Sequence, residues 1–207
     1  YAPGDGKYNY SHTKALTEQL TLEYRDRLAV TIVRPVITYG PGDEWGMMTK
    51  LVTMLAAGHF IPVGDGRNHL HLAYVSDMIQ GLILAGESER AVGQTYIIAG
   101  QSPIPMNELL DKICIILDVP RPRRHVPVAL TKAVGGFLEG LYTLKKALGI
   151  KVGGESPFLT RDKVDTLTIN RGFDISKACT ELGYRPQVDY DRGLRMTIEW
   201  YRKRGYI

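Results

Sequence analysis

The sequence predicts an α/β protein. Short β-branched runs that end at glycine or proline alternate with longer segments in which apolar residues recur at helical spacing. Such alternation favours a parallel sheet covered by helices. The early part of the chain supplies few of the strands that a complete doubly wound sheet needs. We therefore expect part of such a sheet and, toward the carboxyl terminus, a smaller and mostly helical domain.

The first hundred residues contain most of the predicted strands. Strands are predicted at 28–33, 60–63, 69–74 and 94–99. Helices are predicted at 10–27, 47–57 and 76–85, the first of them after nine residues rich in turn formers. The two middle strands flank a Gly-Asp-Gly turn, so we interpret them as a strand pair or as two edge strands. Ser76 or Asp77 is expected to cap the helix that follows.

The second half of the chain is predicted to be mostly helical. Helices are predicted at 106–117, 127–148, 175–182 and 190–204. The stretch 127–148 is the most apolar of these and contains Gly135, Gly136 and Gly140. We expect these glycines to allow close helix packing or to break the helix. A phosphate-binding turn is not expected there, because no strand precedes the glycines.

The composition is that of an ordinary globular protein, with 44% hydrophobic and 23% charged residues. The net charge is only +4, and basic residues are interspersed with acids, so we expect no nucleic-acid partner. One dense basic run, Arg121 to His125, is interpreted as a solvated loop, with a grip on a ligand phosphate as the alternative.

Neither the cysteines nor the histidines are spaced like metal ligands. Cys114 and Cys179 lie far apart, and the five histidines occur singly, so we expect no disulfide framework and no metal. No apolar run is long enough to cross a bilayer, and the first residues lack a signal-peptide pattern. The expectation is a cytoplasmic protein.

Tyr10 and Lys14 are the candidate chemical pair. Residues four apart on a helix project from nearly one face, so the phenol and the ammonium would be neighbours. A phenol with a pKa near 10 is a poor proton donor or acceptor at neutral pH, and a nearby cation lowers that pKa. A Tyr four residues before a Lys is common on amphipathic helix surfaces. The surrounding sequence must therefore decide whether the pair is catalytic.

The context resembles the extended short-chain dehydrogenase/reductase family, which includes nucleotide-sugar epimerases and dehydratases, hydroxysteroid dehydrogenases and dihydroflavonol reductases. The matching segments follow one another in the family's order over nearly the whole chain. They are Tyr-Ser-His-Thr-Lys at 10–14, Thr-Ile-Val-Arg-Pro at 31–35, Val-Ile-Thr-Tyr-Gly-Pro-Gly-Asp at 36–43, Pro-Val-Gly-Asp-Gly at 62–66, Leu-Ala-Tyr-Val-Ser-Asp at 72–77, Gly-Gln-Thr-Tyr at 93–96, Phe-Asp-Ile-Ser-Lys-Ala at 173–178 and Glu-Leu-Gly-Tyr-Arg-Pro at 181–186.

The resemblance implies NAD or NADP as cofactor and a role for each part of the site. Tyr10 would be the general acid/base, while Lys14 would bind the nicotinamide ribose and lower the pKa of Tyr10. The backbone from Pro35 through Val36 to Ile37 would line the nicotinamide. Tyr39 would shape the substrate entrance, with a packing role as the equal alternative.

Two departures from the family pattern concern the upstream half. The glycine-rich dinucleotide turn occurs nowhere in the sequence, and residues 1–9 hold no Ser or Thr to assist the tyrosine. We therefore expect the chain by itself to be inactive. The resemblance assigns 1–100 to the later part of a Rossmann-type NAD(P)-binding domain with interleaved substrate-domain segments. It assigns 101–207 mostly to a substrate-binding domain, with some segments returning to the sheet.

Several features bear on the substrate. The strand ending at Arg34 is followed by Pro35 and not by the Asn of many nucleotide-sugar enzymes, and 126–148 is strongly apolar. Both favour oxidation or reduction of a secondary alcohol or ketone on a sterol-like or other apolar substrate. For the apolar stretch, however, a helix buried in the small domain is the favoured interpretation. Arg67 and Arg124, with Arg123, keep a nucleotide-sugar epimerase or dehydratase as the alternative, because guanidinium groups can clamp a diphosphate.

Two further hypotheses concern assembly and loss of catalysis. In the family the helix that carries the tyrosine often pairs with its twin, so a homodimer through Leu16, Leu20 and Leu22 is a possible arrangement. Burial of these leucines against the protein's own sheet is the alternative. A non-catalytic binding module that reuses the fold is the remaining hypothesis.

Overall fold

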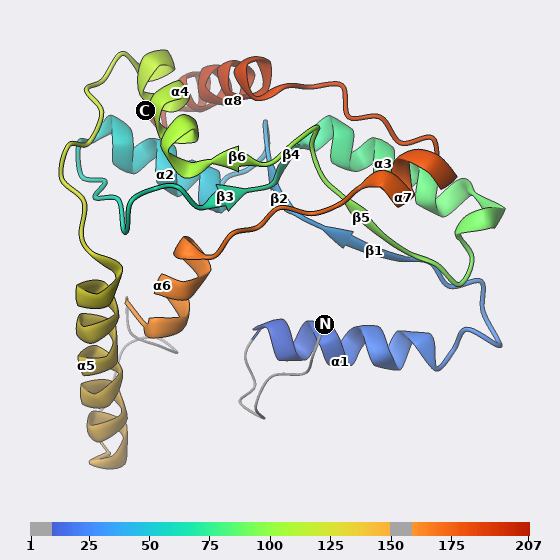
Figure 1. Ribbon diagram of the computed structural model, residues 1–207, viewed down its shortest axis with the longest axis horizontal. Coiled ribbons are helices and arrows are strands. Elements are labelled where there is room, and N and C mark those ends of the chain that lie inside the picture. Colours follow the sequence, from blue (N-terminus) through green and yellow to red (C-terminus); the bar gives the residue numbers. More distant parts are fainter. Residues whose placement is uncertain (1–9, 150–158) are drawn as a thin grey trace. The chain divides into compact units, whose positions relative to one another are not determined.

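The computed structural model describes residues 10–149 and 159–207 and divides into two compact units (Figure 1). Unit 1 comprises Tyr1–Thr38, Leu72–Gln101 and Phe173–Asp189. Unit 2 comprises Tyr39–His71, Ser102–Gly172 and Tyr190–Ile207. Each unit is thus assembled from three separate stretches of chain. Helices and parallel strands are both present, so the predicted α/β class is confirmed.

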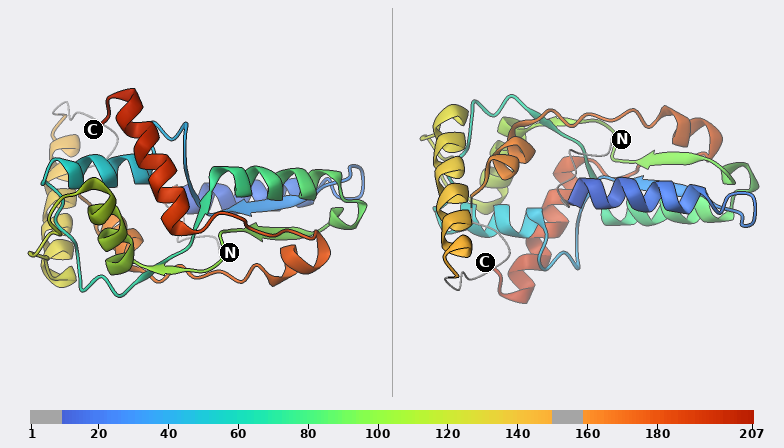
Figure 2. Two further views of the ribbon diagram at one scale, coloured as in Figure 1. Left: turned by 90° about the horizontal axis from the view of Figure 1, so that it is seen from above. Right: turned by 90° about the horizontal axis from the view of Figure 1, so that it is seen from below.

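Unit 1 is built on a parallel strand pair with helices on both faces. Strands β1 (Ile32–Pro35) and β5 (Thr95–Ile98) pair in parallel with Ile32 opposite Thr95. Helix α1 (Tyr10–Leu22) lies on one side of β1 and α3 (Val75–Glu87) on the other (Figures 1 and 2). The remaining elements are β4 (Leu72–Tyr74), which pairs with β2 (Ile37–Tyr39), the 3-10 turn η1 (Glu89–Ala91) and α7 (Ser176–Glu181).

The core of unit 1 joins α3, β5 and the late segment that carries α7. Buried Met78 and Ala85 of α3 pack with Tyr96 and Ile98 of β5 and with fully buried Tyr184. The Tyr184 hydroxyl donates a hydrogen bond of 2.8 Å to the backbone carbonyl of Ala99. Burial of this phenol raises its pKa well above the usual range, so it stays neutral. Residues from the far end of the sequence thereby complete the core of unit 1.

Unit 2 is mainly helical. Its helices are α2 (Met47–Ala56), α4 (Met106–Leu117), α5 (Val128–Ala147), α6 (Arg161–Thr168) and α8 (Tyr190–Arg204). Strands β3 (His69–Leu70) and β6 (Ile104–Pro105) form an antiparallel pair. Helix α4 packs against α2 and α8. The buried hydroxyls of Thr49 on α2 and Tyr201 on α8 lie 2.9 Å apart, so hydrogen bonding also ties these two helices together.

The structure corrects some of the predicted elements. The first helix ends at Leu22, and 23–28 continue as hydrogen-bonded turns, so the strand after it begins later, at Ile32. The stretch 69–74 is not half of a strand pair with 60–63, because β3 pairs with β6 and β4 with β2. In 60–63 only Val63 makes a β-bridge, to Val126. Helix α6 was not predicted.

The predicted cap of α3 is wrong. The helix begins at Val75, so Ser76 and Asp77 lie inside its first turn, and the N-cap residue Tyr74 makes no side-chain cap bond. Asp77 is buried, and its Oδ2 accepts a hydrogen bond of 3.0 Å from the backbone N–H of Val188. A buried carboxylate needs such a donor. Asp77 therefore holds the returning segment 173–189 in place within unit 1.

We predict that Tyr184→Phe destabilises the protein by about 1–3 kcal/mol, because the buried Ala99 carbonyl loses its donor. Urea unfolding followed by circular dichroism measures the change. Tyr190→Phe is the matched control, since the Tyr190 hydroxyl donates a bond of equal length to the Ser102 carbonyl at a more exposed position. Equal losses in the two variants would contradict the role given to burial.

Candidate active site

An ion pair between Glu18 and Arg34 fastens α1 to the sheet of unit 1. The Arg34 guanidinium donates two hydrogen bonds to the Glu18 carboxylate, from Nε at 2.9 Å and from Nη2 at 2.6 Å. The side chains are 20% exposed for Glu18 and 35% exposed for Arg34. Two parallel hydrogen bonds fix the orientation of the carboxylate as well as its distance. The pair therefore restrains both the spacing and the rotation of α1 relative to β1.

The electrostatics of the pair follow from the same contacts. The hydrogen bonds from Arg34 lower the pKa of Glu18, and partial burial opposes this effect only in part. The Glu18 carboxylate is thus charged at neutral pH, and its attraction to Arg34 is present at every pH at which it is ionised.

This ion pair sets the position of the predicted catalytic residues. Lys14 and Tyr10 lie four and eight residues before Glu18 in α1, so all three positions share one helical face. Helix and strand run in opposite directions (Figure 1), so the helix positions before Glu18 lie toward the carboxyl end of β1. The side chain of Tyr10 lies outside the described part of the structure. Lys14 is an exposed residue of α1.

The predicted nicotinamide-lining segment continues directly from β1. Pro35 is opposite Ile98 at the end of the parallel pair, and the Val36 N–H donates a bond of 3.3 Å to the Ile98 carbonyl. Ile37 then begins β2. Ligands of open α/β sheets bind beyond the carboxyl ends of parallel strands. Unit 1 thus contains both the helix of positions 10 and 14 and the segment 35–37, which begins at this end of β1.

Tyr39 belongs to unit 2 and is buried, with 2% of its surface exposed. Its ring stacks on Tyr190 at a centroid distance of 6.4 Å and an interplanar angle of 15°. Gly193 in α8 leaves room for the Tyr39 ring, because a Cβ there would lie 2.4 Å from the Tyr39 hydroxyl oxygen. These contacts describe packing, and a contact of Tyr39 with substrate stays a prediction.

Arg67 lies on an exposed turn of unit 2. Its guanidinium is 3.7 Å from the Asp65 carboxylate, and both side chains are largely exposed. The Arg67 N–H also donates to Asp65 Oδ1, at 3.1 Å. The residue thus has a local partner within its own turn, and its predicted contact with substrate stays untested.

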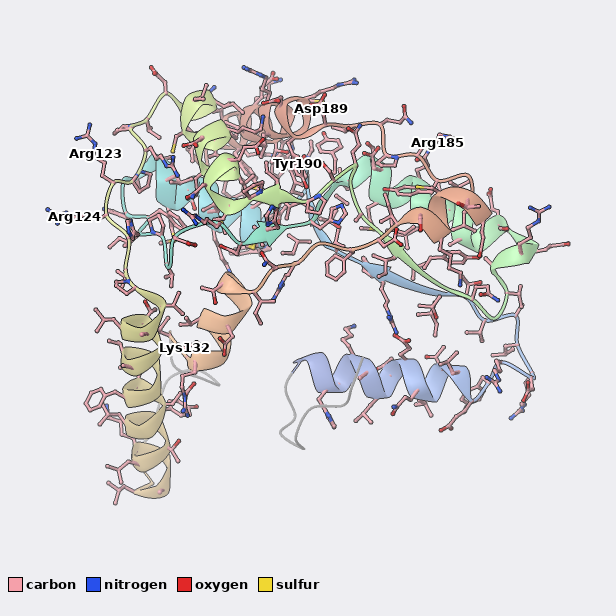
Figure 3. All side chains as sticks on the ribbon, viewed as in Figure 1. Arg123, Arg124, Lys132, Arg185, Asp189 and Tyr190 are labelled. Carbon is pink, nitrogen blue, oxygen red and sulfur yellow. The ribbon has the colours of Figure 1, made fainter. Side chains whose placement is uncertain are left out.

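The basic run 121–125 borders a cavity of about 340 Å³ in unit 2. Its lining residues are Pro62, Gly64, Asp65, Asn107, Arg121, Pro122, Arg123 and His125. Arg124, which the sequence favoured, is not among them, and Figure 3 shows its side chain pointing away from the chain. Arg121 bonds to Asp111 and to Asn107. Asn107 was missed by the sequence analysis, because its place beside the Gly64–Gly66 turn depends on tertiary structure.

Metal-binding clusters and membrane-spanning helices are both absent from the described residues. Within 10–149 and 159–207, no cluster of three or more His, Cys, Asp or Glu side chains is arranged to hold a metal ion. Among the same residues, no helix combines the length and apolar character needed to cross a membrane.

We predict that Glu18→Gln destabilises the protein by about 1 kcal/mol at neutral pH, because the bidentate ion pair is lost. The pKa of Glu18 is lowered by folding, so the stabilisation is present above the unfolded value of about 4.3 and is lost as the pH falls through the folded value. Denaturant titrations between neutral and acidic pH should show the two proteins converge. The exposed Glu23→Gln is the control, and a pH-independent difference would contradict this account.

We predict that Gly193→Ala destabilises unit 2 by about 1–3 kcal/mol, because the added methyl collides with the fully buried Tyr39 ring. Gly140→Ala is the matched control within another helix, since nothing lies within 4 Å of its Cβ position. That control should gain about 0.5–1 kcal/mol from helix propensity. Thermal unfolding of both variants measures the contrast, and a neutral Gly193→Ala would argue against tight packing around Tyr39.

The sequence and the fold were compared with known proteins. Residues 3–99 match the model of the NAD dependent epimerase/dehydratase family. The chain is 35% identical over 211 residues to 3beta-hydroxysteroid-dehydrogenase/decarboxylase isoform 1 of Arabidopsis thaliana, covering 95% of the chain and 47% of the relative. It is 30% identical to 2-alkyl-3-oxoalkanoate reductase of Stenotrophomonas maltophilia, covering 90% of the chain and 56% of the relative. The chain spans about half the length of the curated relatives it matches.

Solved structures have the same fold. A nucleoside-diphosphate-sugar epimerase from Pseudomonas aeruginosa superposes with a TM-score of 0.74 at 21% identity, over 100% of the chain and 59% of the epimerase. A UDP-glucuronic acid 4-epimerase from Bacillus cereus superposes with a TM-score of 0.68 at 19% identity, over 96% of the chain and 53% of that structure. At such identities the likeness shows the fold. Residues 3–99 thus match the NAD dependent epimerase/dehydratase family, and the similarity to these relatives supports the extended short-chain dehydrogenase/reductase family.

Proposed function

We propose that the full-length protein containing this chain is a cytoplasmic NAD(P)-dependent oxidoreductase. It interconverts a secondary alcohol and a ketone on a sterol-like or other apolar substrate. The observation that carries the proposal is the placement of positions 10 and 14 on α1, whose rotation against β1 is set by the Glu18–Arg34 pair.

The proposed roles follow from the chemistry of the two side chains. Tyr10 exchanges a proton with the substrate oxygen, and the Lys14 ammonium favours the phenolate and binds the cofactor ribose. NAD or NADP, when bound, supplies the hydride acceptor or donor. The end of the parallel strand pair, with Lys14 on one side and 35–37 beyond β1, fits the nicotinamide end of such a cofactor. The adenine end would need a glycine-rich turn, which this sequence does not contain.

We assign cofactor binding to unit 1 and substrate binding to unit 2. Unit 1, with its parallel strand pair between helices, is proposed as the later part of the dinucleotide-binding domain. Unit 2 is proposed as the substrate domain. The interleaved boundaries refine the division into 1–100 and 101–207, because 39–71 joins unit 2 and 173–189 joins unit 1.

The substrate class is supported by the relatives at 30% identity or more. Their names describe a dehydrogenase of a hydroxysteroid and a reductase of an alkyl-substituted oxoalkanoate. The proline and valine after Arg34 agree with this choice, because they place apolar groups where many nucleotide-sugar enzymes carry an Asn.

A nucleotide-sugar epimerase or dehydratase is the second candidate, and the cavity in unit 2 is the observation that favours it. Arg121 and Arg123 line this cavity, so it presents guanidinium groups that suit a diphosphate. Side-by-side assays with sterol-like alcohols and with UDP-sugars would separate the two candidates.

A homodimer through α1 is a further proposal. Leu16 and Leu20 are 41% and 56% exposed, which leaves an apolar strip on the helix that carries Tyr10. The mass of the full-length protein in solution tests this arrangement, and a monomer would contradict it.

We predict that Tyr10→Phe in the full-length protein lowers turnover by about 10²–10⁴-fold, because the proton-transferring hydroxyl is lost. The folded state should change little. Nicotinamide absorbance measures turnover, and Tyr24→Phe, at an exposed tyrosine just after the same helix, is the control. Near wild-type turnover of Tyr10→Phe would refute the assignment.

We predict that Lys14→Ala weakens cofactor binding as well as turnover, because the ribose loses its cationic hydrogen-bond donor. Titration of cofactor against protein fluorescence measures the affinity apart from catalysis. Lys50→Ala, on the exposed side of α2, should leave that affinity unchanged. An unaltered affinity in Lys14→Ala would remove the proposed ribose contact.

A further inference from the structure

Helix α5 exposes a continuous apolar stripe. Six large apolar side chains recur at alternating spacings of four and three residues, which places them along one side of the helix. Between 39% and 66% of each residue is exposed. The stripe consists of Leu130, Val134, Phe137, Leu141, Leu144 and Leu148. The smaller Ala133, Gly140 and Ala147 beside it are exposed as well.

The opposite side of α5 makes the contacts with its own unit, and several of these contacts are polar. The Lys132 ammonium pairs with Asp165 of α6, and Glu139 accepts hydrogen bonds of 2.8 and 2.9 Å from Arg161. Gly135 approaches the backbone of Thr160, where a Cβ would lie 3.1 Å from the carbonyl carbon. Figure 1 shows α5 and α6 side by side. The helix thus packs through its polar and glycine side and presents its apolar side outward.

This arrangement reverses the usual pattern of a helix in a globular protein, where the apolar face is buried. Contiguous exposed apolar side chains mark sites of interaction when they form a large patch, because each side chain that becomes buried contributes about 1.5–3 kcal/mol. The polar contacts with α6 hold the stripe in this outward orientation.

The segment 121–151, which contains the stripe, is rich in basic residues, although Arg121 and Lys132 pair with Asp111 and Asp165. The segment 121–151 contains seven Lys and Arg residues and one acidic residue, Glu139, whereas the whole chain has 26 Lys and Arg against 22 Asp and Glu. Acids therefore outnumber bases in the remainder of the chain. Arg123 and Arg124 precede α5 and point away from the chain (Figure 3), and Lys145 is exposed near its other end. The stripe thus lies between exposed cationic groups.

We propose that α5 binds along the surface of an anionic membrane, with the stripe at the level of the acyl chains and the flanking cations at the headgroups. The stripe is about 27 Å long at 1.5 Å per residue, so a helix lying in the membrane plane can bury all of it. A second copy of the chain is a poorer occupant, because its α5 region has the same positive charge.

Co-sedimentation of the full-length protein with vesicles tests the proposal. Vesicles of phosphatidylcholine with phosphatidylserine should bind the protein, and phosphatidylcholine alone should bind it much more weakly. Phe137→Asp combined with Leu144→Asp should reduce binding at least about ten-fold, because two side chains that enter the acyl region become charged. Arg123→Ala combined with Arg124→Ala should reduce it by about five-fold for each arginine. Ile115→Asp is the matched control, because Ile115 is 73% exposed on α4, outside the stripe, and should bind unchanged.

A membrane surface and a second copy of the chain would give different results in these experiments. Circular dichroism first verifies that each variant is folded, and Phe137→Ser with Leu144→Ser provides a milder replacement. Vesicle binding that survives the stripe substitutions would overturn the proposal. So would absence of vesicle binding together with a dimer that the stripe substitutions convert to monomer, which would identify a second copy as the occupant. Equal binding to both kinds of vesicle would overturn the anionic preference. None of these measurements depends on Tyr10 or Lys14. The membrane-binding proposal is therefore tested independently of the proposed oxidoreductase reaction.

Discussion

The ion pair between Glu18 and Arg34 is the constraint on which the candidate active site depends. Helix α1 is largely exposed, and its most buried described residue is Ala15, whose small side chain specifies rotation poorly. A bidentate pair is directional, so it can select one rotation of the helix where apolar contact would allow several. Because positions 10 and 14 lie on the same face as Glu18, the orientation of the two proposed catalytic positions follows from a residue for which no catalytic role is proposed.

The second constraint is the return of the chain into unit 1 after most of unit 2 has been made. The Tyr184 hydroxyl and the Asp77 carboxylate each form a buried or half-buried bond between 173–189 and earlier parts of unit 1. These contacts join residues more than 80 positions apart. Contacts of such separation carry a large loop-closure cost, so unit 1 depends on the carboxyl-terminal part of the chain for its core.

The sequence predicted best those elements whose periodicity is strong and whose ends carry their own signals. The bounds of α4 and α8 were confirmed to the residue, because each is long and amphipathic. Pairing of β3 with β6 and β4 with β2 was not predictable, since the partners of two- and three-residue strands are chosen by tertiary contacts. Asp77 has a sequence signal for capping but bonds to Val188, and Asn107 has no local signal for its place beside the cavity. The roles of Tyr10 and Lys14 rest on the family's motif order and stay predictions.

Helix α5 illustrates a limit of periodicity as a guide to burial. An apolar stripe in a sequence predicts an amphipathic helix, and the usual inference is that the stripe faces the protein. Here Gly135 and Gly136 allow α6 to approach the other side, and two ion pairs satisfy the polar groups between the helices. Among the described residues, the outward leucine and phenylalanine side chains of α5 stay largely exposed. Binding to a surface would remove them from water, and the basic residues of 121–151 favour an anionic surface.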